Sequence, residues 1–391
     1  STRAGAEYGY ALIWAIVLAN LFKYPFLEFG PRYAIATGKH MISGYRSLGR
    51  WAYRVYVIFT VGTMFAIQAA VTVVTASLAA EMTGLELNAG IWSIIILGVC
   101  ILLLIKNSYA ILDSVIKLFM VVLALSTAIA IGAALLQPGG ETAAVQLQAP
   151  NIWTVSGVAF LIALMGWMPI PIDASVWHSI WTLERSRQTN YKPRLKESLI
   201  DFNIGYIGAA IFAVIFMILG AEILYGSGQS YAASGAEFSQ QLIELYTSTL
   251  GDWAYPIIIA CAFSTMFSTT FTVTDTYPRV CCELLNQTRS QDLAEFDASD
   301  TTYRFMLVTI SGVSIGLLFL MGDHFRLLID LATTLSFLTA PILAFINFRL
   351  VYHDDVSKAF HRPAWLHYLA VAGMLFLTGF ALFYIYWMIG I

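Results

Sequence analysis

Long apolar stretches recur along the whole chain and constrain its fold more than any other feature. Several approach or exceed the roughly 20 residues that a helix needs to cross a bilayer. Only helices and closed barrels satisfy the backbone in lipid, and the short alternation of barrel strands is missing. We therefore predict an all-α polytopic membrane protein with ten spans, near 8–36, 52–80, 91–105, 109–136, 153–181, 200–226, 251–279, 304–322, 327–347 and 364–390.

Composition agrees with this interpretation. Hydrophobic residues make up 59% of the 391 and charged residues 12%, whereas soluble domains are about half apolar and about a quarter charged. The four cysteines lie in or at the ends of apolar spans and lack the spacing of zinc ligands. Because no compositional break divides the chain, we expect a single transmembrane domain over residues 1–391.

The basic residues predict an orientation. Sixteen of the 21 Lys and Arg residues fall in alternate connecting segments, and two fall in the opposite segments. Cytoplasmic segments carry the excess of positive charge. This places Ser1 and Ile391 outside and makes the cytoplasmic segments 37–54, 106–108, 182–199, 279–304 and 348–363.

Sequence motifs of soluble enzymes are absent. The chain has no Walker loop, no Gly-x-Ser-x-Gly elbow and no His-Glu-x-x-His helix. We therefore expect neither an enzyme nor an ATP-driven pump, and we expect no cofactor and no nucleic-acid partner. Any chemistry should lie inside the membrane.

One apolar span, 153–181, is interrupted near its middle. A single helix of this length would run about 43 Å, more than the ~30 Å hydrocarbon core. Pro169 and Pro171 each remove a backbone donor, so a continuous helix cannot pass. Asp173 beside them is costly in lipid unless it faces protein or water. The pattern predicts two half-helices that meet near mid-membrane, as in secondary transporters; a kinked packing helix with a buried, paired Asp is the alternative.

Other polar residues occur in spans that could face this break. Their hydroxyls can equally bond back to their own helices, whereas an intramembrane acid is a functional hypothesis by default. Lys23 and Glu28 flank Pro25, and we expect them to form a structural pair or to lie near an interface. The further candidates are Gln68, the i,i+4 pair Asp113 and Lys117, the helical face of Ser264, Ser268, Thr272 and Asp275, and the group Asp330, Thr333, Thr334 and Thr339.

The order of these features resembles the Nramp family of proton-coupled divalent-metal transporters, which have the LeuT inverted-repeat fold. Segment 1–40 is similar to the end of the family's helix 1, its helix 2 and the following loop, with Arg32 as a match. Segment 167–179 is similar to its broken helix 6, including the pair His178 and Ser179. "FSTMFSTTFT" and "TTLSFLTAPILAF" are similar to helices 8 and 10.

The resemblance implies particular site residues. The family's metal ligands in Asp-Pro-Gly-Asn on helix 1 should lie upstream of Ser1. Its Met-Pro-His on helix 6 aligns either with Met168, Pro169 and Ile170 or, when His178 is the anchor, with Pro171, Ile172 and Asp173. Its helix 10 glutamine falls on Thr334, and its helix 3 Asp and Glu fall on Gln68 and Val71. The implied substrate-binding residues are Met168, Pro169, Pro171, Asp173, Thr334, Ser264 and Ser268, with Asp173 and Met168 as metal ligands and with Gln68, Asp113 and Asp275 on a proton pathway.

We therefore hypothesise a secondary transporter that moves a divalent metal cation, coupled to protons, across a bacterial inner membrane. A thioether ligand would select softer metals, whereas Asp173 with Thr334 would suit a harder cation. A transporter of a small organic or amino-acid-like solute is the second hypothesis, and a receptor-like or scaffold membrane protein is the third. Two or more converging acids would favour the cation, and an acid-free cavity lined by hydroxyls would favour the organic solute.

Overall fold

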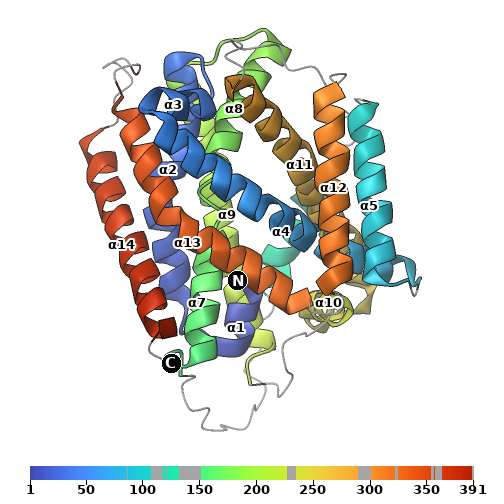
Figure 1. Ribbon diagram of the computed structural model, residues 1–391. Helices are drawn as coiled ribbons and strands as arrows, with labels where there is room; N and C mark the ends of the chain where they lie inside the picture. Colours follow the sequence, from blue (N-terminus) through green and yellow to red (C-terminus); the bar gives the residue numbers. More distant parts are fainter. Residues whose placement is uncertain are drawn as a thin grey trace.

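The computed structural model describes residues 1–85, 87–106, 118–119, 121–130, 132, 151–226, 235–288, 301–321, 325–353, 356 and 363–389, and every regular element in these ranges is helical. The elements run side by side as one bundle (Figure 1). In chain order they are α1 (Thr2–Tyr8), α2 (Ile13–Thr37), α3 (Met41–Leu48), α4 (Arg50–Thr83), α5 (Ala89–Ile105), α7 (Val155–Trp167), α8 (Ala174–Thr189), α9 (Leu195–Ile223), α10 (Gly235–Leu250), the 3-10 turn η1 (Asp252–Ala254), α11 (Tyr255–Thr288), α12 (Thr301–Met321), α13 (Phe325–Val351) and α14 (Ala364–Ile389).

The spans expected from the sequence correspond to these helices, except that 109–136 lies largely outside the described residues. Six helices in the described part of the chain are long and apolar enough to cross a membrane, by length and composition: α4, α9, α11 with η1, α12, α13 and α14. Three further spans expected from the sequence do not meet these requirements of length and apolar composition, and each has an identifiable cause. Helix α2 carries Lys23, Glu28 and Arg32, α5 has 17 residues, and the 153–181 span is divided into α7 and α8.

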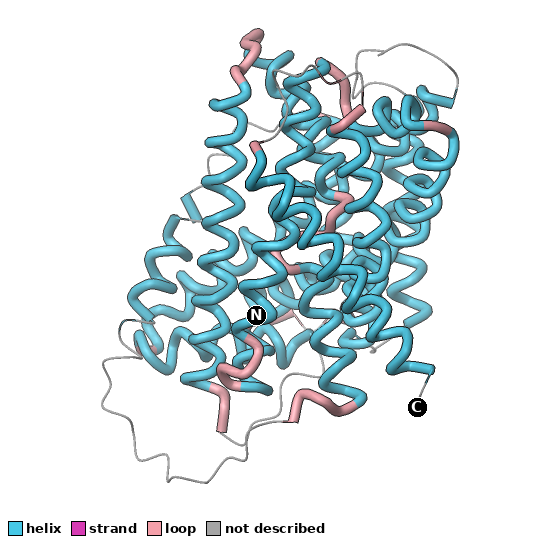
Figure 2. The backbone as a smooth tube through the Cα atoms, turned by 90° about the vertical axis from the view of Figure 1, so that its left-hand side faces the viewer, coloured by secondary structure: helices cyan, strands magenta, loops and turns pink. Residues whose placement is uncertain are grey.

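The position of Ser1 corrects the sequence interpretation. We expected it outside the membrane, yet it lines an internal cavity, and Figures 1 and 2 show the start of the chain partway along the bundle. The first twelve residues form the short helix α1 and a turn ahead of α2, and they are not part of that span. A count of basic residues assigns sides to the loops between spans and carries no information on such a segment.

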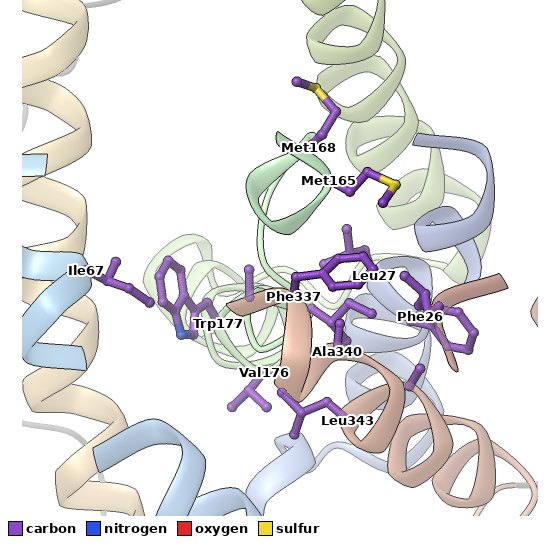
Figure 3. Packing of buried hydrophobic residues seen from close by; sticks show 14 of the residues in the cluster. Phe26, Leu27, Ile67, Met165, Met168, Val176, Trp177, Phe337, Ala340 and Leu343 are labelled. Atoms are coloured by element: carbon purple, nitrogen blue, oxygen red, sulfur yellow. The ribbon is translucent and has the colours of Figure 1, made fainter. Parts of the chain in front are cut away.

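The core lies where α2, α4, α7, α8 and α13 meet. Figure 3 shows Phe26 and Leu27 of α2 beside Phe337, Ala340 and Leu343 of α13, with Met165 and Met168 at the end of α7 close by. Close backbone contact is required here: a Cβ on Gly30 of α2 would lie 2.2 Å from the carbonyl oxygen of Ser175 on α8. The second half of the broken span is thereby held directly against α2.

Candidate functional site

The break between α7 and α8 is the structural centre of the site. Helix α7 ends at Trp167 and α8 begins at Ala174, so residues 168–173 are not helical, as the two prolines predicted. Figure 2 shows short loop segments that interrupt the helices inside the bundle. Irregular backbone at this depth is tolerated where it is buried in protein or lines a cavity.

A cavity of about 550 Å³ adjoins this break. Met168 and Pro169 line it, together with residues of α1, α4, α7, α9, α11 and α13, so six helices contribute to one cavity. Most of the lining is apolar, including Val71, Phe160 and Phe216. Clefts of roughly 300–1,000 Å³ with few, well-placed polar groups are typical of small-ligand sites.

Charged side chains lie at one wall of the cavity. Arg3 Nη1 of α1 donates to Asp330 Oδ1 of α13 at 3.0 Å, and Arg3 Nε donates to Glu7 Oε1 at 3.0 Å. The Arg3 guanidinium also lies 4.4 Å from the centre of the Phe160 ring on α7. Arg3 and Asp330 both line the cavity, so the one carboxylate among its described lining residues is engaged by a guanidinium.

Lys23 occupies the other side of the break. Its Nζ donates to the carbonyl oxygens of Met165 at 2.6 Å and Gly166 at 2.7 Å, and the side chain is fully buried. The expected partner, Glu28, instead binds Arg32, with Arg32 Nε 2.8 Å from Glu28 Oε2. The pairing of Lys23 with Glu28 was therefore wrong. The i,i+4 spacing of Glu28 and Arg32 is the signal that would have given the correct partner.

Asp173 is buried with 7% of its surface exposed, and it does not line the cavity. Its Oδ2 has no hydrogen-bond partner, and the carboxylate interacts electrostatically with Lys23. Pro171 is also buried away from the cavity lining. Of the two alignments of the helix 6 motif, the one through Met168 therefore brings its methionine to the cavity.

Thr334, Ser264 and Ser268 are partly exposed and lie outside the cavity lining. The neighbouring Thr333 lines the cavity instead, since consecutive residues on a helix point in directions about 100° apart. On α11 the buried hydroxyls that bond to α4 are those of Thr270 and Thr274.

Two of the three proton-pathway candidates, Gln68 and Asp275, have different hydrogen-bond partners in the structure. Gln68 Nε2 on α4 donates to Thr274 Oγ1 at 3.0 Å and to Thr72 Oγ1 at 3.2 Å. Asp275 accepts from Arg279 Nε at 2.8 Å and from Tyr303 Oη at 2.6 Å, which connects α11 with α12. Asp113 lies outside the described residues. Their roles in proton passage stay predictions.

From the sequence, neither Lys23 nor Arg3 was assigned to the site, and Thr334 was preferred to Thr333, which stood among the further candidates. Lys23 carried a usable signal, since an ionisable residue in an apolar span is a functional candidate by default. Arg3 carried none, because its partner Asp330 lies on a helix remote in sequence, and the choice between Thr333 and Thr334 depends on the rotation of α13. In the ranges that the structure describes, no three His, Cys, Asp or Glu side chains come together as a ready metal cluster. The described cavity lining includes the Met168 thioether and the Asp330 carboxylate, both of which are groups able to ligate a metal.

A helical bundle with a broken helix beside a cavity is typical of multi-pass membrane transporters. Two solved structures of a manganese transporter from Eremococcus coleocola share the fold: one bound to an aromatic bis-isothiourea compound (TM-score 0.66, 14% identity) and one of a point mutant (TM-score 0.66, 16% identity). Each comparison covers 98% of this chain and 81% of that chain. At this identity the likeness establishes the fold, which is the LeuT-like transporter fold expected from the sequence.

The chain belongs to the Nramp family: the family model, described as natural resistance-associated macrophage protein-like, matches residues 1–386. An uncharacterized protein of Pasteurella multocida is 32% identical over 98% of this chain and 87% of its own length. The metal transporter Nramp2 of rice is 25% identical over 70% of this chain and 52% of its own length. Family members are transporters and not enzymes, and membership supports a metal-ion transporter as the class.

Proposed function

We propose that this protein is a secondary transporter of a divalent transition-metal cation, coupled to protons, in the inner membrane of a bacterium. The position of Met168 supports this most directly. Its thioether lines the cavity beside the broken backbone, where carbonyl oxygens are not tied up in a helix. Thioether sulfur favours softer metals over Mg²⁺ and Ca²⁺. The metal transporters among the comparisons support a metal as the cargo, and the relative from Pasteurella multocida supports a bacterial membrane.

The substitution Met168→Leu tests the thioether, because it keeps the volume of the side chain and removes the sulfur. We expect uptake of Mn²⁺ or Cd²⁺ into proteoliposomes to fall by about tenfold, as for the loss of roughly 1.4 kcal/mol of binding. Folding should be little affected, since Leu and Met interchange at small cost.

Met165→Leu is the matched control. Met165 lies three residues earlier on α7, is fully buried and does not line the cavity. It should retain wild-type uptake. Equal uptake by Met168→Leu and wild type would contradict the role of the sulfur, and equal loss in both variants would indicate a packing effect.

Proton coupling predicts a second measurement. If protons accompany the metal inward, Mn²⁺ added outside proteoliposomes should acidify their interior, as reported by an enclosed pH-sensitive dye. An inward pH gradient should also raise the initial rate of metal uptake several-fold. Metal uptake could instead be independent of the pH gradient and cause no internal acidification. This result would contradict proton coupling but not metal transport.

The alternative substrate, a small organic or amino-acid-like solute, is not favoured, because the chain belongs to a family that supports a metal-ion transporter. The cavity matches neither of the two patterns that would separate these substrates. Its described lining has one carboxylate, where a cation site would have two or more, and few hydroxyls, where a site for an organic solute would have many. Uptake of no divalent metal by correctly folded protein would reopen that alternative.

A further inference from the structure

A cluster of backbone carbonyls at the end of α7 surrounds the ammonium group of Lys23. The Nζ lies 2.6 Å from the Met165 oxygen, 2.7 Å from the Gly166 oxygen and 3.4 Å from the Ile170 oxygen. The lysine comes from α2, more than 140 residues away in sequence, and its side chain has no exposed surface. The three contacts span the break from the last turn of α7 into the irregular segment.

The sequence explains why these oxygens are available. In a continuing helix the Met165 carbonyl would accept from the N–H of residue 169, which is Pro169 and has none. The Gly166 carbonyl would accept from residue 170, which lies beyond the end of α7 at Trp167. The last carbonyls of a helix also carry its partial negative charge. The break therefore creates a buried, electronegative cluster that requires a donor or a cation.

The surroundings also favour a cation at this point. Asp173, at the start of α8, interacts electrostatically with Lys23 and is itself buried, with its Oδ2 free of any hydrogen-bond partner. In transporters with broken helices, unwound carbonyls and the carboxyl ends of half-helices coordinate Na⁺. Here the same kind of oxygens contact a nitrogen that belongs to the chain.

We propose that the end of α7 is a monovalent-cation site and that the Lys23 ammonium is its resident, tethered cation. The broken helix is consequently held together without Na⁺. Removal of the ammonium opens the site to a free monovalent cation, of which methylammonium or Na⁺ fits the oxygens. This inference does not depend on the cargo, because its main observable is the stability of the protein.

The test uses the full chain purified in detergent, with Lys23→Ala as the variant that leaves both the oxygens and the space. In choline buffer its melting temperature should fall by about 5 °C or more, because buried carbonyls lose their donor. Titration with methylammonium chloride or NaCl, exchanged for choline chloride at constant ionic strength, should recover at least half of this loss and should saturate.

Two controls make the result specific. Lys23→Met fills the space without a charge, so its melting temperature should be lowered and should not respond to either cation. Wild-type protein and Lys39→Ala, at an exposed lysine, should show no dependence on the cation. A wild-type melting temperature for Lys23→Ala in choline, or an equal response of all four proteins to Na⁺, would overturn the proposal.

If Lys23→Ala does not survive extraction in choline, the same membranes are extracted in methylammonium or Na⁺ buffer. The readout is then the monodisperse fraction in size-exclusion chromatography. A recovered monomer peak in either of these cations supports the site, and failure in every buffer overturns it.

Discussion

Gly166→Ala is expected to destabilise the protein severely. A Cβ at this position would lie 2.0 Å from the carbonyl oxygen of Thr333 and 2.8 Å from its carbonyl carbon. These are backbone atoms of α13, so no side chain can rotate away, and α7 would have to separate from α13 at the point where the span breaks. Overpacking of a well-packed core costs about 1–3 kcal/mol, and we expect the upper end of this range here. Thermal unfolding in detergent, followed by a thiol-reactive dye on the buried cysteines, measures the effect.

Gly98→Ala and Gly205→Ala are the matched controls, because no atom lies within 4 Å of a Cβ at either helical position. Both should be neutral or slightly stabilising, since alanine is the better helix former. If Gly166→Ala unfolds at the same temperature as these controls, α7 and α13 do not make the backbone contact described here.

Asp173→Asn is expected to lower stability through Lys23. The substitution keeps the shape of the side chain and removes the charge that compensates the buried ammonium. Removing one partner of a buried ion pair in direct contact costs about 3–5 kcal/mol. Asp173 and Lys23 interact without a contact of salt-bridge length, so the loss should be smaller than this. We expect a fall of several degrees in melting temperature, with transport per folded molecule reduced much less than for Met168→Leu.

A double-mutant cycle with Lys23→Met isolates this interaction. The double variant should be less destabilised than the sum of the two single variants, because removing both charges leaves neither uncompensated. If the stability losses of Asp173→Asn and Lys23→Met are additive, the two residues do not interact. An unchanged melting temperature with a sharp loss of transport would instead restore Asp173 as a residue of the cation pathway, the role that the sequence suggested.

The break in the 153–181 span illustrates what the sequence determined by itself. Pro169 and Pro171 lack backbone donors wherever they lie, so the end of α7 and the irregular segment 168–173 follow from local chemistry. The helical spans follow likewise, since lipid leaves no other partner for the backbone. The order of local motifs was also sufficient to predict the family.

Tertiary structure decided which polar groups meet. Lys23 was visible as a lysine in an apolar span, but its partners are carbonyls more than 140 residues away. Pro169 shows that an oxygen is left free, and only the packing of α2 against α7 shows which donor reaches it. Thr333 and Thr334 are equivalent by composition, and the rotation of α13 against α7 alone places Thr333 at the cavity. Asp173 and Met168 are five residues apart and were both plausible metal ligands. The irregular segment between them places Met168 at the cavity and leaves Asp173 buried away from it, near Lys23, because direction after a helix end depends on packing and not on helical periodicity.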